Sequence, residues 1–174
     1  MTSAAEAPTA VVVVAVGNRF GCDDGVAAAV LDAAAPRLPA AVETREVDGE
    51  ATRLLDAWEG AGAAVVVDAV RSGRDAGTLH RLVVTGASGE VHDWPARPSG
   101  ASTHAAGLAD ALALGGALDR LPAHVVLLAV EGVDFSPGDR LTPAVAAAVP
   151  AAADAVVAEV ERLAQRARAT GSVR

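Results

Sequence analysis

Unbroken runs of valine, alanine and leucine constrain the fold of this chain more than any other feature. They occupy residues 11–16, 63–67 and 125–130, and the second run lies inside an expected strand at 63–70. A strand that is buried on both faces reads as a continuous apolar run, and such strands form parallel sheets that helices cover on both sides. The runs therefore predict a three-layer α/β fold, with a mainly parallel, twisted sheet of about five strands between helices.

The segments between these runs supply the remaining elements. Residues 41–47 and 78–85 alternate between apolar and polar side chains, which is typical of strands. Residues 90–94 are expected to return as a short antiparallel strand. We expect helices from Gly25 to Pro36 and over three further segments, the last of which Pro150 could break: 50–58, 103–114 and 143–168.

The length and composition indicate a single domain over residues 1–174, with flexible tails at 1–9 and 169–174. Hydrophobic residues make up 52% of the chain, far more than a disordered chain carries. Aromatic residues make up only 2%, so alanine, valine and leucine must build the core.

Charge and cysteine content narrow the classes of partner and compartment. The 14 basic and 22 acidic residues give a net charge of −8, which disfavours nucleic acid and anionic membranes as partners. A single cysteine, Cys22, excludes an internal disulfide and fits a reducing cytosol. No signal peptide or transmembrane helix is expected, so we predict a cytoplasmic protein.

Asp24, Asp68 and His104 form the candidate site. Asp24 lies in the loop after the first valine run, Asp68 ends the second, and His104 opens a helix. Ligands of α/β sheets bind outside the carboxyl ends of parallel strands. The positive end of a helix dipole disfavours imidazolium, and neutral imidazole is the form that binds metal. Two carboxylates and one imidazole therefore predict a site for a divalent transition metal.

Each of these residues also has a purely structural explanation. Asp23 or Asp24 could cap the helix that follows, and Asp68 could cap a turn. His104 could be a solvated or packed histidine. Glu131, after the last apolar run, reaches the same edge of the sheet and is a reserve carboxylate, unless it only anchors its own loop.

Other catalytic chemistries have less support. The acids beside Cys22 oppose formation of a thiolate, so we do not expect a catalytic cysteine. No serine lies in a Gly-x-Ser-x-Gly context, and residues 17–25 do not match the Gly-x-Gly-x-x-Gly pattern of dinucleotide sites. The remaining histidines are expected to be structural: His80, His92 and His124.

Four short motifs, in this order, span nearly the whole chain. They are Gly17-Asn18 with Asp23-Asp24-Gly25-Val26, Val67-Asp68-Ala69, Ser102-Thr103-His104 with Gly107-Leu108, and Leu141-Thr142-Pro143-Ala144-Val145. Together they resemble the motifs of the hydrogenase maturation proteases, the endopeptidases that trim the large subunit of nickel–iron hydrogenases. The first loop departs from the family pattern at Arg19, Gly21 and Cys22, and Ala27 stands where many relatives have glycine.

The resemblance implies that Asp24, Asp68 and His104 are the catalytic and metal-binding residues. It also implies the removal of a C-terminal extension from a hydrogenase large-subunit precursor that already carries nickel. The metal would then be a divalent transition metal, nickel presented by the substrate.

Two other functions are compatible with the same three residues. One is a metal-sensing or chaperone domain that binds the nickel-loaded precursor without cutting it. The other is a small-molecule hydrolase with a tightly bound divalent metal. The three ligands support all three functions equally, and the order of the motifs favours the protease.

Overall fold

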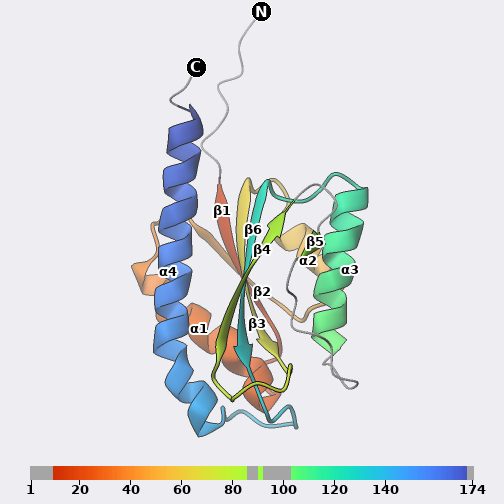
Figure 1. Cartoon of the computed structure of the whole chain (residues 1–174), viewed down its shortest axis with the longest axis vertical. Helices are drawn as coiled ribbons and strands as arrows, with labels where there is room; N and C mark the ends of the chain where they lie inside the picture. Colours follow the sequence, from red (N-terminus) through yellow and green to blue (C-terminus); the bar gives the residue numbers. More distant parts are fainter. Residues whose placement is uncertain (1–9, 86–89, 92–102, 172–174) are drawn as a thin grey trace, which may run out of the picture.

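The computed structural model describes residues 10–85, 90–91 and 103–171 (Figure 1). Its strands form a six-stranded sheet in the order β2-β1-β3-β6-β4-β5. The strands are β1 (Val11–Val16), β2 (Glu43–Val47), β3 (Ala63–Val70), β4 (Leu79–Thr85), β5 (Glu90–Val91) and β6 (His124–Glu131). Neighbours among β2, β1, β3 and β6 are parallel, whereas β4 runs antiparallel to β6 and to β5.

Helices cover both faces of this sheet, which confirms the predicted three-layer architecture (Figure 1). They are η1 (Cys22–Gly25), α1 (Val26–Ala34), η2 (Ala35–Arg37), α2 (Ala51–Ala57), α3 (Thr103–Ala117) and α4 (Pro143–Gly171). Helices α1 and α4 lie on one face, and α2 and α3 lie on the other.

Alternation along the strands divides the apolar residues between two cores. Val13 and Val65 pack with α1 and α4, whereas Val14 and Val66 pack with α2 and α3. Trp58 lies in the second core and is fully buried. Valine and leucine thus fill most of both cores, as the low aromatic content requires.

The expected elements agree with the observed ones except at a few boundaries. Strand β2 begins at Glu43 rather than at residue 41, and Glu43–Val47 is largely exposed because it lies at the edge of the sheet. Pro150 does not break α4, which continues to Gly171 and so includes residues 169–171 of the expected tail. The expected tail at 1–9 and residues 92–94 of the expected strand lie outside the described residues.

Helix α4 is also the one helix of the described residues that is long and apolar enough to cross a membrane, judged by length and composition alone. Side chains along its length, among them Val145, Val156 and Leu163, are buried in the core against the sheet.

The connections between the first three strands create a switch point in the sheet. The chain passes from β1 to β2 through α1 on one face, and from β2 to β3 through α2 on the other face. As a result, β2 and β3 lie on opposite sides of β1. The carboxyl ends of β1 and β3 therefore flank the position at which ligands bind in open α/β sheets.

Candidate functional site

The loop after β1 folds tightly around Asp24, which is 5% exposed. The backbone N–H of Asn18 donates to Oδ2 of Asp24 at 2.8 Å, and the N–H of Asp24 donates to the carbonyl of Gly21 at 3.0 Å. Gly17 has a φ of +141°, and a Cβ atom there would overlap the carbonyl oxygen of Asp24. The glycine thus lets the chain turn back closely enough to hold the Asp24 carboxylate just beyond β1.

Asp68 lies inside β3 and is 2% exposed. The structure confirms the expected strand at 63–70, and Asp68 lies two residues before its end rather than at the end itself. Its Oδ1 accepts a hydrogen bond from the N–H of Ala69 at 2.8 Å. Val66 and Val70, two positions to either side, both pack in the core under α2 and α3. Because side chains alternate along a strand, Asp68 faces the same side as these helices.

His104 lies in the first turn of α3, as its position in the sequence predicted, and its side chain is outside the described part of the structure. The backbone at Gly107, one turn further on, lies against the loop after β2, where a Cβ atom would overlap the carbonyl oxygen of Gly49. The N–H of Gly17 in turn donates to the carbonyl of Val47, the last residue of β2, at 3.0 Å. The start of α3 and the ends of β1 and β2 are therefore linked by direct backbone contacts.

Asp24, Asp68 and the first turn of α3 thus lie at the same end of the sheet, near the switch point between β1 and β3. The carboxylates of Asp24 and Asp68 are both buried, and carboxylate oxygens are suitable ligands for a divalent cation. Among the side chains that the structure describes, a set that leaves out His104, no group of three His, Cys, Asp or Glu residues is placed to hold a metal ion.

Asp23 has a structural role that the sequence did not reveal. Its carboxylate accepts hydrogen bonds from the N–H groups of Val133 at 2.9 Å and Asp134 at 3.0 Å, and from the N–H and hydroxyl of Thr142 at 2.7 and 3.0 Å. Burial opposes ionisation, but these bonds outweigh it and lower the pKa of Asp23. Asp23 therefore holds the loop between β6 and α4, and the expectation that it caps the next helix is wrong, since α1 has no side-chain cap.

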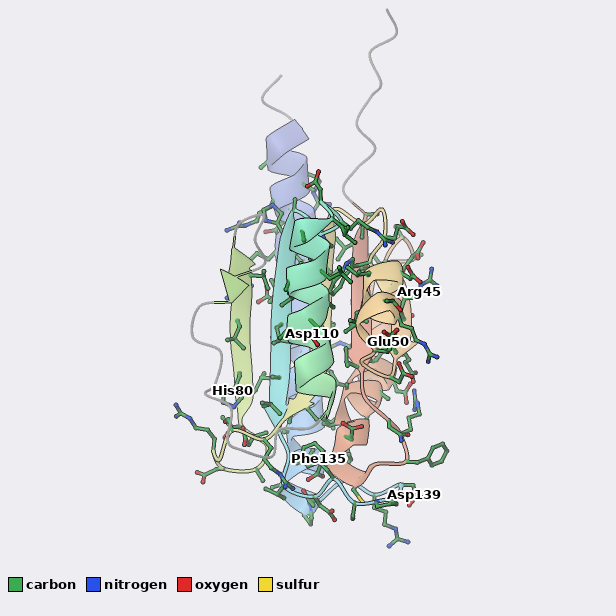
Figure 2. The ribbon with its side chains drawn as sticks, turned by 90° about the vertical axis from the view of Figure 1, so that its right-hand side faces the viewer. Arg45, Glu50, His80, Asp110, Phe135 and Asp139 are labelled. Atoms are coloured by element: carbon green, nitrogen blue, oxygen red, sulfur yellow. The ribbon has the colours of Figure 1, made fainter. Side chains whose placement is uncertain are left out.

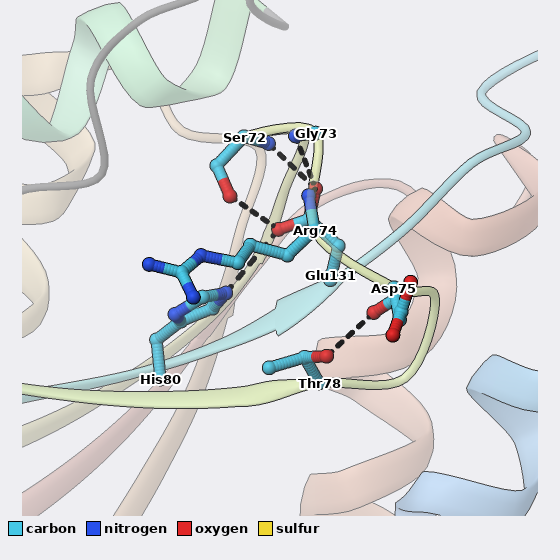
Figure 3. Close-up of polar contacts among 7 residues, drawn as sticks. All are labelled: Ser72, Gly73, Arg74, Asp75, Thr78, His80 and Glu131. Atoms are coloured by element: carbon cyan, nitrogen blue, oxygen red, sulfur yellow. Dashed lines mark hydrogen bonds and ion pairs between the residues drawn. The ribbon is translucent and has the colours of Figure 1, made fainter.

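Glu131 is an anchor for a neighbouring loop rather than for its own (Figure 3). Its carboxylate accepts from the N–H groups of Ser72 at 2.6 Å and Gly73 at 2.9 Å, from the Ser72 hydroxyl at 2.7 Å, and lies 3.2 Å from Nε2 of His80. Burial opposes its ionisation, but the bonds from Ser72, Gly73 and His80 lower the pKa of Glu131. These contacts support the structural assignment of His80 and leave Glu131 committed to the loop between β3 and β4.

The surroundings of Cys22 also agree with a structural role. Cys22 is buried, with its Sγ 3.8 Å from the Oγ of Ser136. His124 pairs with Ala63 at the opposite end of the sheet, at the starts of β6 and β3. His92 lies outside the described residues.

The loop between β6 and α4 completes this end of the molecule. Figure 2 shows Phe135 and Asp139, both from this loop, at the end where α3 begins. The guanidinium of Arg71 lies over the ring of Phe135, 4.9 Å from its centre, and donates to the carbonyl of Val133. The loops after β1, β3 and β6 therefore contact one another at the end of the sheet that carries the candidate site.

Comparison with known proteins gives a consistent set of similarities. A family model described as hydrogenase maturation protease matches residues 47–159. A search of curated proteins gives no match. Among solved structures, the hydrogenase maturating endopeptidase HybD from E. coli is 24% identical, with a TM-score of 0.70, and the match covers 88% of this chain and 93% of that one.

Two archaeal structures are similar over a comparable length. The [NiFe] hydrogenase maturation protease HybD from Thermococcus kodakarensis is 25% identical, with a TM-score of 0.63 and coverage of 89% of this chain and 99% of that one. The hydrogenase 2 maturation peptidase from a Thaumarchaeota archaeon is 24% identical, with a TM-score of 0.63 and coverage of 87% and 97%. The fold of this chain, over nearly its whole length, is therefore the fold of these proteins.

Proposed function

This chain belongs to the hydrogenase maturation protease family, and we propose that it is the endopeptidase that removes the C-terminal extension from the large-subunit precursor of a nickel–iron hydrogenase. The observation that supports the proposal most is that Asp24, Asp68 and the first turn of α3 lie at the same end of the sheet, near the switch point between β1 and β3. The family motifs and the ligand-binding position of the fold thus coincide.

We further propose that Asp24, Asp68 and His104 bind nickel that the precursor itself presents. Carboxylate and imidazole ligands suit a divalent transition metal, and three ligands leave coordination positions for groups of the substrate. The two carboxylates are buried, so they are held in place before the substrate arrives. The ion would then fix the scissile segment against this edge of the sheet, and positioning of this kind supplies much of the rate in an enzyme.

The test is incubation with nickel-loaded and with nickel-free precursor, followed by mass spectrometry of the new C-terminus. We expect cleavage of the nickel-loaded precursor alone. Equal cleavage of both forms would refute the role of nickel, and tight binding without cleavage would instead identify a chaperone or metal-sensing domain.

Asp68→Asn with a matched control separates the proposed ligand from a general effect of charge. The Asn variant keeps nearly the same shape but removes one negative ligand, so processing should fall at least about 100-fold, because even indirect supports of a metal site cost about 10–100-fold. Asp110→Asn removes a carboxylate from the exposed surface of α3 (Figure 2) and should process normally.

Binding of metal to the free protein tests the ligand set without the substrate. We expect weak, reversible binding of nickel and zinc that weakens as His104 takes up a proton at lower pH. Calorimetric titration of His104→Ala should show reduced binding, and undiminished binding would remove His104 from the site. We place this activity in the cytoplasm, a proposal supported by the single, unpaired Cys22.

A further inference from the structure

Phe20 is the most exposed large apolar side chain of the described residues, with 73% of its surface accessible. It lies in the same loop as Asp24, four positions before it. Val133, which is 49% exposed, lies in the loop after β6 at the same edge of the sheet. Single exposed apolar residues are common on protein surfaces, so the position of Phe20 and Val133 on the loops next to Asp24, and not their exposure alone, is the relevant observation.

Backbone hydrogen bonds join these two loops. The N–H of Gly138 donates to the carbonyl of Phe20 at 2.9 Å, and the N–H of Cys22 donates to the carbonyl of Gly138 at 2.9 Å. The N–H of Val133 donates to the carboxylate of Asp23 at 2.9 Å. The exposure of Phe20 is therefore not a consequence of a loosely attached loop.

The residue before Phe20 fixes the loop from its other side. The guanidinium of Arg19 makes hydrogen bonds to both carboxylate oxygens of Asp32 on α1, at 2.8 and 3.0 Å, and to both of Glu46 on β2, at 2.5 and 2.9 Å. The N–H of Phe20 donates to Oδ1 of Asn18 at 2.9 Å. The guanidinium of Arg19 is thus paired with carboxylates of the protein itself, whereas the side chain of Phe20, the next residue, extends into solvent.

The other phenylalanine of the chain is in a different situation. Phe135 is partly buried against the core and lies under the guanidinium of Arg71. Among the described residues, Phe20 is therefore the aromatic side chain at this edge that is available to a partner without rearrangement.

We propose that Phe20, together with Val133, is the docking point for an apolar segment of the large-subunit precursor that flanks its scissile region. The inference rests on the proposed function, because any substrate that reaches Asp24 and Asp68 must approach the loops that carry these two residues. An aromatic side chain on a rigidly held backbone is a suitable anchor, since only its own two torsion angles are fixed when it is covered. Phe20 would act on substrate affinity and not on the chemical step.

The experiment compares variants in the steady-state processing of nickel-loaded precursor. Phe20→Ala should raise KM by about 10- to 100-fold, the effect of withdrawing one phenylalanine side chain from a buried contact, and should leave kcat and the unfolding temperature unchanged. Phe20→Leu should recover most of the affinity, and Val133→Ala should raise KM by a smaller factor. Leu118→Ala, which removes a 52%-exposed side chain after the end of α3, is the matched control and should not alter KM.

Binding of the precursor, measured separately from cleavage, distinguishes this inference from the proposed function. A wild-type protein that binds the precursor without cutting it, and loses binding in Phe20→Ala, would support the docking point and refute the protease. Unchanged KM and unchanged precursor affinity in Phe20→Ala would overturn the docking point. A change confined to the oligomeric state, measured by analytical ultracentrifugation, would also overturn it and assign Phe20 to self-association.

Discussion

The carboxylate of Asp23 accepts hydrogen bonds from both the N–H and the hydroxyl of Thr142, a residue 119 positions further along the chain. Thr142 immediately precedes α4, and its carbonyl accepts from the N–H of Ala146 at 2.9 Å. The first and the last of the four sequence motifs are therefore in direct contact. This contact fixes the start of α4 relative to the loop that holds Asp24.

Asp23→Asn should destabilise the protein while the neighbouring site keeps its ligands. The asparagine amide keeps one acceptor oxygen, so its NH2 group would face the N–H groups of Val133 and Asp134 if that oxygen stays on the N–H of Thr142. The loss of hydrogen bonds to a buried charged group costs about 1–3 kcal/mol. Urea unfolding at pH 7 measures this cost. Asp110→Asn, a change at an exposed carboxylate, should leave the free energy of unfolding nearly unchanged, and an equal loss in both variants would contradict the anchoring role of Asp23.

Glu131→Gln should show a loss of stability that depends on pH. The folded-state pKa of Glu131 is lowered from its ordinary value of 4.5, so its ionised form stabilises the folded state. That contribution is complete above the ordinary value and is lost as the pH falls through the lowered one. The wild type should therefore exceed the variant by about 1–3 kcal/mol at pH 7, and the difference should shrink below pH 4.5.

Unfolding curves of both proteins from pH 7 to pH 2.5 provide the measurement. His80→Ala is a useful comparison because it removes only one of the partners of Glu131, at 3.2 Å, and should cost less. A difference between wild type and Glu131→Gln that stays constant across this range would show that the ionised carboxylate is not the source of the stability.

Gly107→Ala should abolish processing by moving the start of α3. The added Cβ atom would overlap the backbone carbonyl of Gly49, so the helix turn that carries His104 must shift. Gly115→Ala, in the same helix, instead meets Leu121 and Leu55 side chains, which can move aside. We expect both variants to lose stability in thermal unfolding, but only Gly107→Ala to lose cleavage of the precursor; normal cleavage by Gly107→Ala would separate this contact from the site.

Cys22→Ser should have little effect on cleavage of nickel-loaded precursor. The thiol is buried beside Ser136, and a hydroxyl of similar shape can occupy the same position at the usual cost of a single substitution, about 0.5–3 kcal/mol. Mass spectrometry of the product and urea unfolding provide the two readings. Loss of cleavage in Cys22→Ser, together with normal cleavage in Asp68→Asn, would point to a thiol protease and reverse the assigned roles.

The local sequence pattern was sufficient to predict the ranges of the strands that are buried on both faces of the sheet. The expected strands at 11–16 and 63–70 match β1 and β3, and β6 differs from its expected range by one residue at each end. Short continuous apolar runs that are rich in β-branched valine favour a strand buried on both faces over a helix. The expected boundaries of β2 were less accurate. Its side chains are largely exposed, so its ends depend on backbone pairing with β1 and not on a pattern of buried residues.

The amino-acid sequence alone determined the fold class, and it placed Asp24 beyond the first strand and His104 in the first turn of a helix, because these properties depend on residues close together in the chain. Only the tertiary structure decided that Asp23 and Glu131 are anchors. Their partners lie 119 and 59 positions away, at Thr142 and Ser72, and no local pattern marks such pairs. Adjacent carboxylates look alike in a sequence, and they differ in the folded protein because folding brings hydrogen-bond donors to one of them from distant loops.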